Sequence, residues 1–157
     1  MRTQLQIVAV ALVISWWIPM AAWPTEDCQC EHRGPEAAGR SYAVNYRDLV
    51  LANCIARAYK TDPDASMDAG SSASALLEWT AFNMDDASRP MVDIIKSALV
   101  NDGTIEGSGK LPKDVRSSFS RCMDLYHGPG LAEQVRRYVG WPERTARDDA
   151  RAHGLGP

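Results

Sequence analysis

The pattern of apolar positions begins with an almost unbroken apolar run over residues 5–18. Arg2 precedes this run, and the small residues Ala21 and Ala22 follow it before the chain becomes polar. This order is typical of a secretory signal peptide. The run is shorter than the ~20 residues that a membrane helix needs. We therefore expect residues 1–22 to be a signal peptide that is cleaved during export.

The next segment lacks a helical pattern, and a helix follows it. Residues 23–44 combine prolines, glycines and charges without an apolar period, which predicts an irregular leader. From Asn45, interpreted as an N-cap, apolar positions recur at helical spacing. We expect this first helix to end at Asp62 and Pro63, because a proline disfavours helical geometry in the residue before it.

Two more amphipathic segments follow. A second helix is expected from Asp64 or Ala69 to Asn83, with a break or bend at residues 70–72, Gly-Ser-Ser. Residues 88–90, Ser-Arg-Pro, are interpreted as the start of a third helix, with the serine as N-cap and the proline in the first turn.

The last third of the chain alternates between turns and short helices. Residues 101–112 contain three glycines and no apolar period, which predicts a long loop. A fourth helix is expected from Pro112, then a turn at residues 128–130 and a short fifth helix. Residues 141–157 alternate charged with small residues and are expected to be a flexible tail.

Composition supports one helical domain and excludes some partners. The segment after the signal peptide is rich in alanine and leucine and poor in β-branched residues, which favours helices over strands. We predict an all-α fold, a compact bundle of four to five short helices over residues 45–140. A net charge of −3 gives no electrostatic footprint for nucleic acid or for an anionic membrane surface.

The four cysteines suggest disulfide chemistry. Cys54 and Cys122 fall on the apolar faces of two different predicted helices, so in an exported protein we expect them to form a disulfide. Two reduced cysteines in the core are the alternative. Three alternatives remain for Cys28 and Cys30: a metal site with His32, a strained local disulfide, or pairing across a dimer.

We find no convincing catalytic constellation. Cys122 lies five residues before His127, but a disulfide-bonded cysteine is not a nucleophile. Ser71 and Ser72 are not in a nucleophile elbow, because the motif's second glycine is missing. No phosphate-binding glycine loop is present. We therefore expect no catalytic residue, metal or cofactor. A small periplasmic enzyme remains an alternative and would need a free thiol or an activated serine.

Several segments together resemble a known family. They are residues 46–56 (YRDLVLANCIA) with 58–60 (AYK), residues 68–79 (DAGSSASALLEW) and residues 121–127 (RCMDLYH). In this order behind a signal peptide, they resemble the type VI secretion amidase immunity proteins, of the class that neutralises the fourth group of amidase effectors. The likeness covers about residues 45–140.

The resemblance implies a function and an assembly. Such proteins are small, helical, exported to the periplasm and homodimeric, and their cysteine pair matches Cys54 and Cys122. Each binds a cognate NlpC/P60-type peptidoglycan amidase, which uses a cysteine–histidine pair to cut the γ-glutamyl–diaminopimelate bond. One subunit supplies a docking helix and the other inserts a loop near the active site, in a two-plus-two complex. An adaptor for some other partner is a further alternative.

The resemblance and the chain's pattern together select candidate contact residues. Glu78 and Asp85 are candidates for the docking helix. The loop candidates are Asn101, Asp102, Gly103, Thr104, Ile105, Glu106, Gly107, Ser108, Gly109 and Lys110. The glycines would let the backbone approach the floor of the enzyme cleft, and Asp102 and Glu106 would imitate the acidic stem peptide. A surface loop without a partner is the alternative interpretation.

Overall fold

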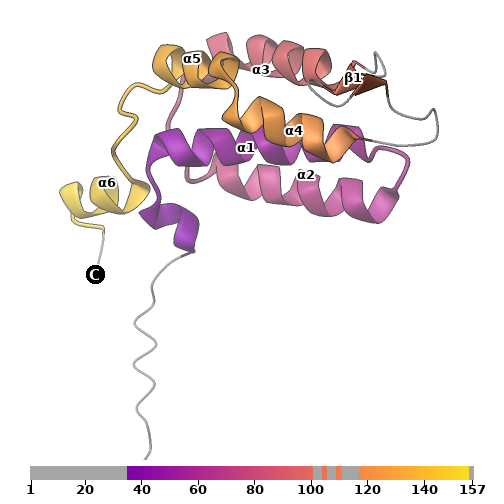
Figure 1. Cartoon of the computed structure of the whole chain (residues 1–157). Coiled ribbons are helices and arrows are strands. Elements are labelled where there is room, and N and C mark those ends of the chain that lie inside the picture. Colours follow the sequence, from indigo (N-terminus) through magenta and orange to yellow (C-terminus); the bar gives the residue numbers. More distant parts are fainter. Residues whose placement is uncertain (1–34, 101–103, 106–108, 111–116, 156–157) are drawn as a thin grey trace, which may run out of the picture. The chain divides into compact units, whose positions relative to one another are not determined.

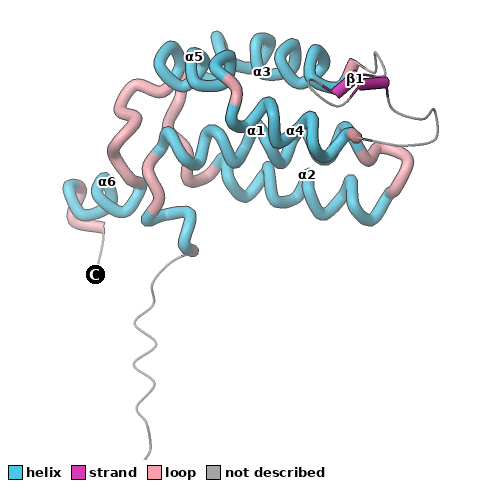
Figure 2. Tube along the Cα trace, in the orientation of Figure 1, coloured by secondary structure: helices cyan, strands magenta, loops and turns pink. Residues whose placement is uncertain are grey.

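The structure, a computed structural model, describes residues 35–100, 104–105, 109–110 and 117–155. Figure 2 shows that this part of the chain is mostly helical, which confirms the all-α fold class. It contains one α-helix more than the largest number expected. The elements are η1 (Glu36–Gly39), α1 (Tyr42–Ala58), α2 (Pro63–Leu77), α3 (Met84–Leu99), β1 (Thr104–Ile105), β2 (Gly109–Lys110), α4 (Ser118–His127), α5 (Pro129–Tyr138) and α6 (Ala146–Ala152).

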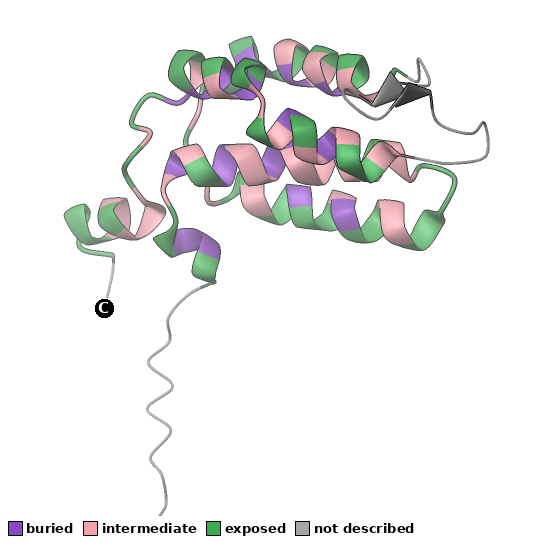
Figure 3. Cartoon of the chain, viewed as in Figure 1, coloured by how far each residue is buried: buried purple, intermediate pink, exposed green. Residues whose placement is uncertain are grey.

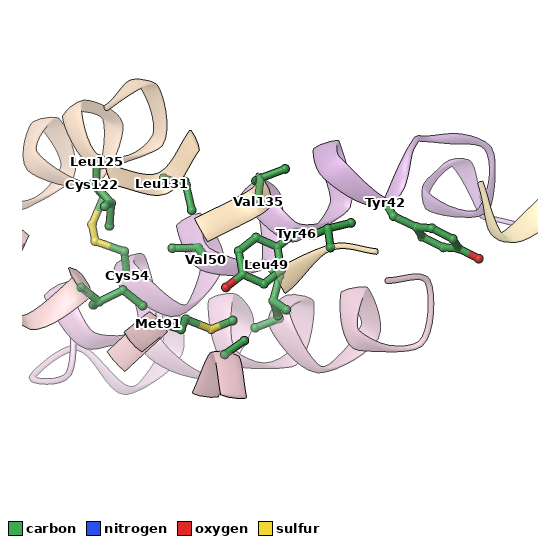
Figure 4. Close-up of a cluster of buried hydrophobic side chains, with 14 residues drawn as sticks. Tyr42, Tyr46, Leu49, Val50, Cys54, Met91, Cys122, Leu125, Leu131 and Val135 are labelled. Carbon is green, nitrogen blue, oxygen red and sulfur yellow. A yellow bond between two sulfur atoms is a disulfide. The ribbon is translucent and has the colours of Figure 1, made fainter. Parts of the chain in front are cut away.

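Helix α1 is the central element, and it contacts α2, α3, α4 and α5 (Figure 1). Tyr46, Leu49, Val50 and Cys54 of α1 are buried at the spacing of one helix face. Figure 4 shows them packed with side chains from the surrounding helices. The exposed faces of α2 and α3 point away from this core (Figure 3). Burial of one apolar face per helix is therefore the main source of cohesion.

The start of α1 differs from the prediction. Its N-cap is Ser41, whose side chain accepts a hydrogen bond from the Val44 amide, so the assignment of Asn45 as N-cap is wrong. Asn45 lies inside the helix and is fully buried. Its Nδ2 donates to the Ala37 carbonyl at 2.8 Å and to the Trp79 carbonyl at 2.7 Å. Asn45 thus joins η1 and the end of α2 to α1.

The bounds of α2 and α3 also correct the prediction. Helix α2 begins at Pro63, runs through residues 70–72 without a break, and ends at Leu77 rather than at Asn83. Asn83 is instead the N-cap of α3, with its Oδ1 accepting from the Asp86 amide. Residues 88–90 therefore lie inside α3 and do not open it.

Part of the expected tail is helical and bonded to α1. The first amides of α1 find acceptors there, because the Tyr42 amide donates to the Arg144 carbonyl and the Ala43 amide to the Pro142 carbonyl. The Tyr42 hydroxyl donates to the Asp149 carboxylate of α6 at 2.7 Å. The two amide bonds satisfy backbone donors that every helix N-terminus leaves without an intrahelical partner.

The expected disulfide is confirmed. Cys54 of α1 and Cys122 of α4 are bonded, with their Cα atoms 5.8 Å apart and both side chains fully buried. The bond closes a loop between residues separated by 68 positions. A loop of this length corresponds to about 4 kcal/mol of stabilisation in the chain-entropy model. The alternative of two reduced core cysteines is excluded.

Several predictions fall on residues outside the described ranges. They include the signal peptide, the pairing of Cys28 and Cys30, and the start of the fourth helix at Pro112, since α4 is described from Ser118. In the described ranges, no helix has the length and apolar character needed to cross a membrane.

Candidate functional site

The predicted loop contains a short β-hairpin between α3 and α4. Strands β1 and β2 pair antiparallel, with Thr104 opposite Lys110 and Ile105 opposite Gly109. Figure 1 shows the hairpin beyond the end of α3. The strand pairing was not expected from the sequence, which predicted an irregular loop. The remaining loop candidates, Asn101, Asp102, Gly103, Glu106, Gly107 and Ser108, lie outside the described residues.

The two ends of this loop are tied together at their base. Arg121 of α4 donates from Nη1 to the carbonyl of Val100 at 2.5 Å, and from Nε to the Ser117 hydroxyl at 3.2 Å. Val100 is the C-cap of α3 and Ser117 the N-cap of α4. The next residue, Cys122, is bonded to Cys54 of α1. The loop therefore begins and ends on anchored helix termini.

The opposite end of α4 is also bonded to α1. The Tyr126 hydroxyl donates to the Asp48 carboxylate at 3.2 Å, and Arg47 donates to the Tyr126 carbonyl at 3.2 Å. Burial raises the pKa of Tyr126, and the negative charge of Asp48 raises it further. Tyr126 therefore stays protonated as a donor at neutral pH, and α4 is anchored to α1 along its length.

The candidate docking residues lie at the junction of α2 and α3. Glu78 is the exposed C-cap of α2, and Asp85 is exposed in the first turn of α3. Asp85 suits that position because acidic side chains are favourable near a helix N-terminus. The adjacent Trp79 carbonyl accepts the hydrogen bond from Asn45, which fixes the backbone beside Glu78. The backbone at this junction is thus held to α1.

Among the described residues of one chain, the docking candidates and the hairpin lie at opposite ends of α3. Asp85 lies at the start of α3, whereas the hairpin follows its end (Figure 1). The 16 residues of α3 correspond to a length of about 24 Å. A single subunit therefore presents the docking residues and the loop at opposite ends of α3.

The described residues offer little for catalysis. Cys122 is in the disulfide, so it is not a thiol nucleophile beside His127. The Ser72 hydroxyl donates to the Asp68 carbonyl within α2. No group of three His, Cys, Asp or Glu side chains that could hold a metal ion occurs within the described ranges. Cys28, Cys30 and His32 lie outside them.

Sequence reasoning missed the role of Arg121. It stands directly before Cys122 in a segment that the resemblance singled out, yet its sequence position does not show that it bonds the end of α3. Val100 and Ser117 lie close together only in the folded chain, so a local sequence pattern does not reveal that one arginine bonds both. A cation directly before a buried cysteine was the signal available in the chain.

Comparison with known proteins identifies a matching family and a similar solved structure. The family model described as "Type VI secretion system (T6SS), amidase immunity protein", Tai4, matches residues 44–135. No curated protein matches the chain. A solved structure from Serratia marcescens, described as "New Type VI-secreted toxins and self-resistance proteins", is similar with 25% identity and a TM-score of 0.63. The match covers 74% of this chain and 90% of the other.

The matched residues run from Val44 in α1 through α4, and they include the disulfide, the loop and both candidate docking residues. They make up more than half of the chain. The chain therefore belongs to the Tai4 family of type VI secretion system amidase immunity proteins.

Proposed function

We propose that this protein is exported to the periplasm, where it binds a type VI secreted peptidoglycan amidase of the NlpC/P60 class and covers its active site. The observation that carries the proposal is the loop with a fixed base between α3 and α4. Family membership supports the amidase as partner. The signal-peptide pattern of residues 1–22 supports export.

Inhibition by occlusion needs a segment that enters the cleft and a scaffold that holds it. The Arg121 bonds and the Cys54–Cys122 disulfide supply that scaffold. Anchoring both ends of the loop before binding lowers the entropy lost on binding, which favours affinity. Gly103, Gly107 and Gly109 allow close approach to the cleft floor. No turnover chemistry and no cofactor are required of the immunity protein.

The separation of the two candidate regions along α3 favours a shared site. We propose that a homodimer presents the loop of one subunit together with Glu78 and Asp85 of its partner. Each composite site would bind one amidase, which gives a complex of two immunity subunits and two enzymes. The cell that makes the protein is thereby protected from its own or its siblings' amidase.

Titration of the purified protein without residues 1–22 against the amidase encoded beside it tests the proposal. Binding is followed by calorimetry and cleavage by release of fragments from purified peptidoglycan. We expect tight binding and a loss of cleavage that is complete at one immunity subunit per enzyme. Binding without loss of cleavage would contradict occlusion. Absence of binding to every type VI amidase of the same genome would contradict the assignment of the partner.

A further inference from the structure

An open groove of about 780 Å³ lies at the base of the loop, where four helices end or begin. The last turns of α1 and α3 and the first turns of α2 and α4 line it, and these ends lie at the loop end of the bundle (Figure 1). Val100 and Ser118, which lie beside the points where the loop leaves and returns, both line the groove. A protein that binds the loop close to its base would therefore contact this groove.

The groove is positively charged in a chain whose net charge is −3. Among the described residues that line it, the charged ones are Arg57, Lys60 and Lys96, and none is a carboxylate. All three cations are exposed. Within the described part of the chain none of them forms an ion pair, whereas Arg40 pairs with Asp48 at 3.4 Å. The groove is thus a concentrated positive surface without an internal counter-charge among the described residues.

Helix dipoles explain only part of this arrangement. Arg57 and Lys96 lie in the last turns of α1 and α3, where cations offset the negative end of a helix. Lys60 lies beyond the end of α1 and is outside that explanation. The dipole also gives no reason why the described lining of the groove holds three cations and no carboxylate in an acidic chain. A role in stability alone predicts that charge reversal lowers the melting temperature and leaves binding unchanged.

We infer that the groove receives an acidic segment at the rim of the amidase's substrate cleft. The inference rests on the proposed function, because the loop must enter that cleft for its rim to reach the groove. Charge complementarity selects a carboxylate-bearing segment. Val100, which is 64% exposed, and the neighbouring Leu99 add apolar surface to the lining of the groove. The groove would act mainly on the rate of association, because unpaired surface cations steer an oppositely charged partner.

The test is the association rate of the amidase with variants of the full mature chain, measured by stopped flow at low and at high salt. The triple variant Arg57→Glu, Lys60→Glu and Lys96→Glu is expected to associate at least about tenfold more slowly at low salt. The deficit should shrink as salt screens the charges. If the triple variant does not fold, Lys60→Glu alone serves as the test, because Lys60 lies outside the helices. It should lower the association rate in the same direction by a smaller factor.

Arg137→Glu is the matched control, because Arg137 lies in the last turn of α5, away from the groove. It changes the net charge as any one groove reversal does, and should leave the rate near that of the wild type. If the wild type binds the amidase and both groove variants associate at its rate, the groove proposal is wrong and the proposed function stands. If the wild type binds no type VI amidase, the proposed function fails and the groove proposal fails with it.

Discussion

At the scale of single residues, buried polar side chains determine how the helices fit together. The Tyr46 hydroxyl of α1 donates to Gln134 Oε1 of α5 at 3.1 Å. Gln134 in turn donates from Nε2 to the Pro90 carbonyl of α3 at 2.9 Å. This chain of hydrogen bonds joins three helices through the core. Buried polar groups stabilise a fold only when they are paired, so these bonds specify one register of the helices.

Replacement of Tyr46 by phenylalanine tests this chain at two pH values. At pH 7 the variant should lose about 1–3 kcal/mol in the free energy of unfolding, because the buried Gln134 oxygen loses its donor. Burial raises the pKa of Tyr46 from 10.0 to about 12. The folded wild type therefore keeps a proton that the unfolded chain releases, and its stability should fall between these two pKa values.

The variant lacks this titration, so its stability should approach that of the wild type as pH rises through the same range. Urea denaturation at each pH measures the difference. Tyr42, whose pKa is also raised to about 12, first by burial, is present in both proteins and contributes equally. A difference that stays constant with pH would show that Tyr46 does not titrate as its burial requires.

Gly70 offers a substitution that should stabilise the protein. It lies inside α2, and a Cβ added there would meet nothing within 4 Å. Gly70→Ala should therefore raise the free energy of unfolding by roughly 0.5–1 kcal/mol. Gly128→Ala is the matched comparison, because its Cβ would lie 2.9 Å from the Asp124 carbonyl oxygen, and it should destabilise. Equal melting temperatures for the two variants would contradict this account.

At the scale of elements, the apolar pattern predicted the helix faces better than the helix starts. Cys54 and Cys122 were placed on facing stripes, and the disulfide confirms that placement. The start of α1 was missed although its N-cap, Ser41, is a local signal. Its first amides also bond to Pro142 and Arg144, about a hundred residues away in the chain. A local pattern contains no sign of such acceptors. It also gave no indication of η1 or α6.

The start of α3 was missed for a different reason. Asn83, followed by acidic residues in the first turn, is itself a cap signal, but the pattern was interpreted as the end of the second helix. Ser88, two residues before Pro90, has the pattern of an N-cap, and the helix start was therefore assigned there. In the structure, Asn83 lies against α5, and its backbone amide donates to the Tyr138 carbonyl at 2.9 Å. That tertiary bond fixes the turn between α2 and α3.

The loop is the element whose replacement tests inhibition most directly. A short linker in place of residues 103–109 should abolish most of the inhibition of the amidase. The fold should survive, because the Arg121 bonds to Val100 and Ser117 and the disulfide lie outside the replaced segment. Amidase assays with peptidoglycan, thermal melting and a free-thiol count under denaturing conditions measure these outcomes. Full inhibition by the variant would show that the loop is not the inhibitory element.

At the scale of the whole molecule, the length of α3 is the feature that connects structure to assembly. The sequence located both candidate regions, but their separation depends on where α3 begins, which the pattern placed at residues 88–90 rather than at Met84. The longer helix spans about 24 Å, with Asp85 in its first turn and the hairpin following its last. If the docking residues and the loop both contact one enzyme, the simplest arrangement is that they come from two different subunits. Each subunit then brings one end of its own α3 to that enzyme.

A complementation experiment tests this sharing of sites. One variant carries the linker in place of residues 103–109, and the other carries Glu78→Arg with Asp85→Arg. Each homodimer lacks one half of both composite sites and should inhibit poorly. A mixed dimer pairs the intact loop of one subunit with the intact docking residues of the other, which restores one complete site. Co-expressed mixed dimers, isolated through two different affinity tags, should bind one amidase per dimer when mass is measured by light scattering. If the mixed dimer inhibits no better than either parent, the loop and the docking residues do not act across subunits.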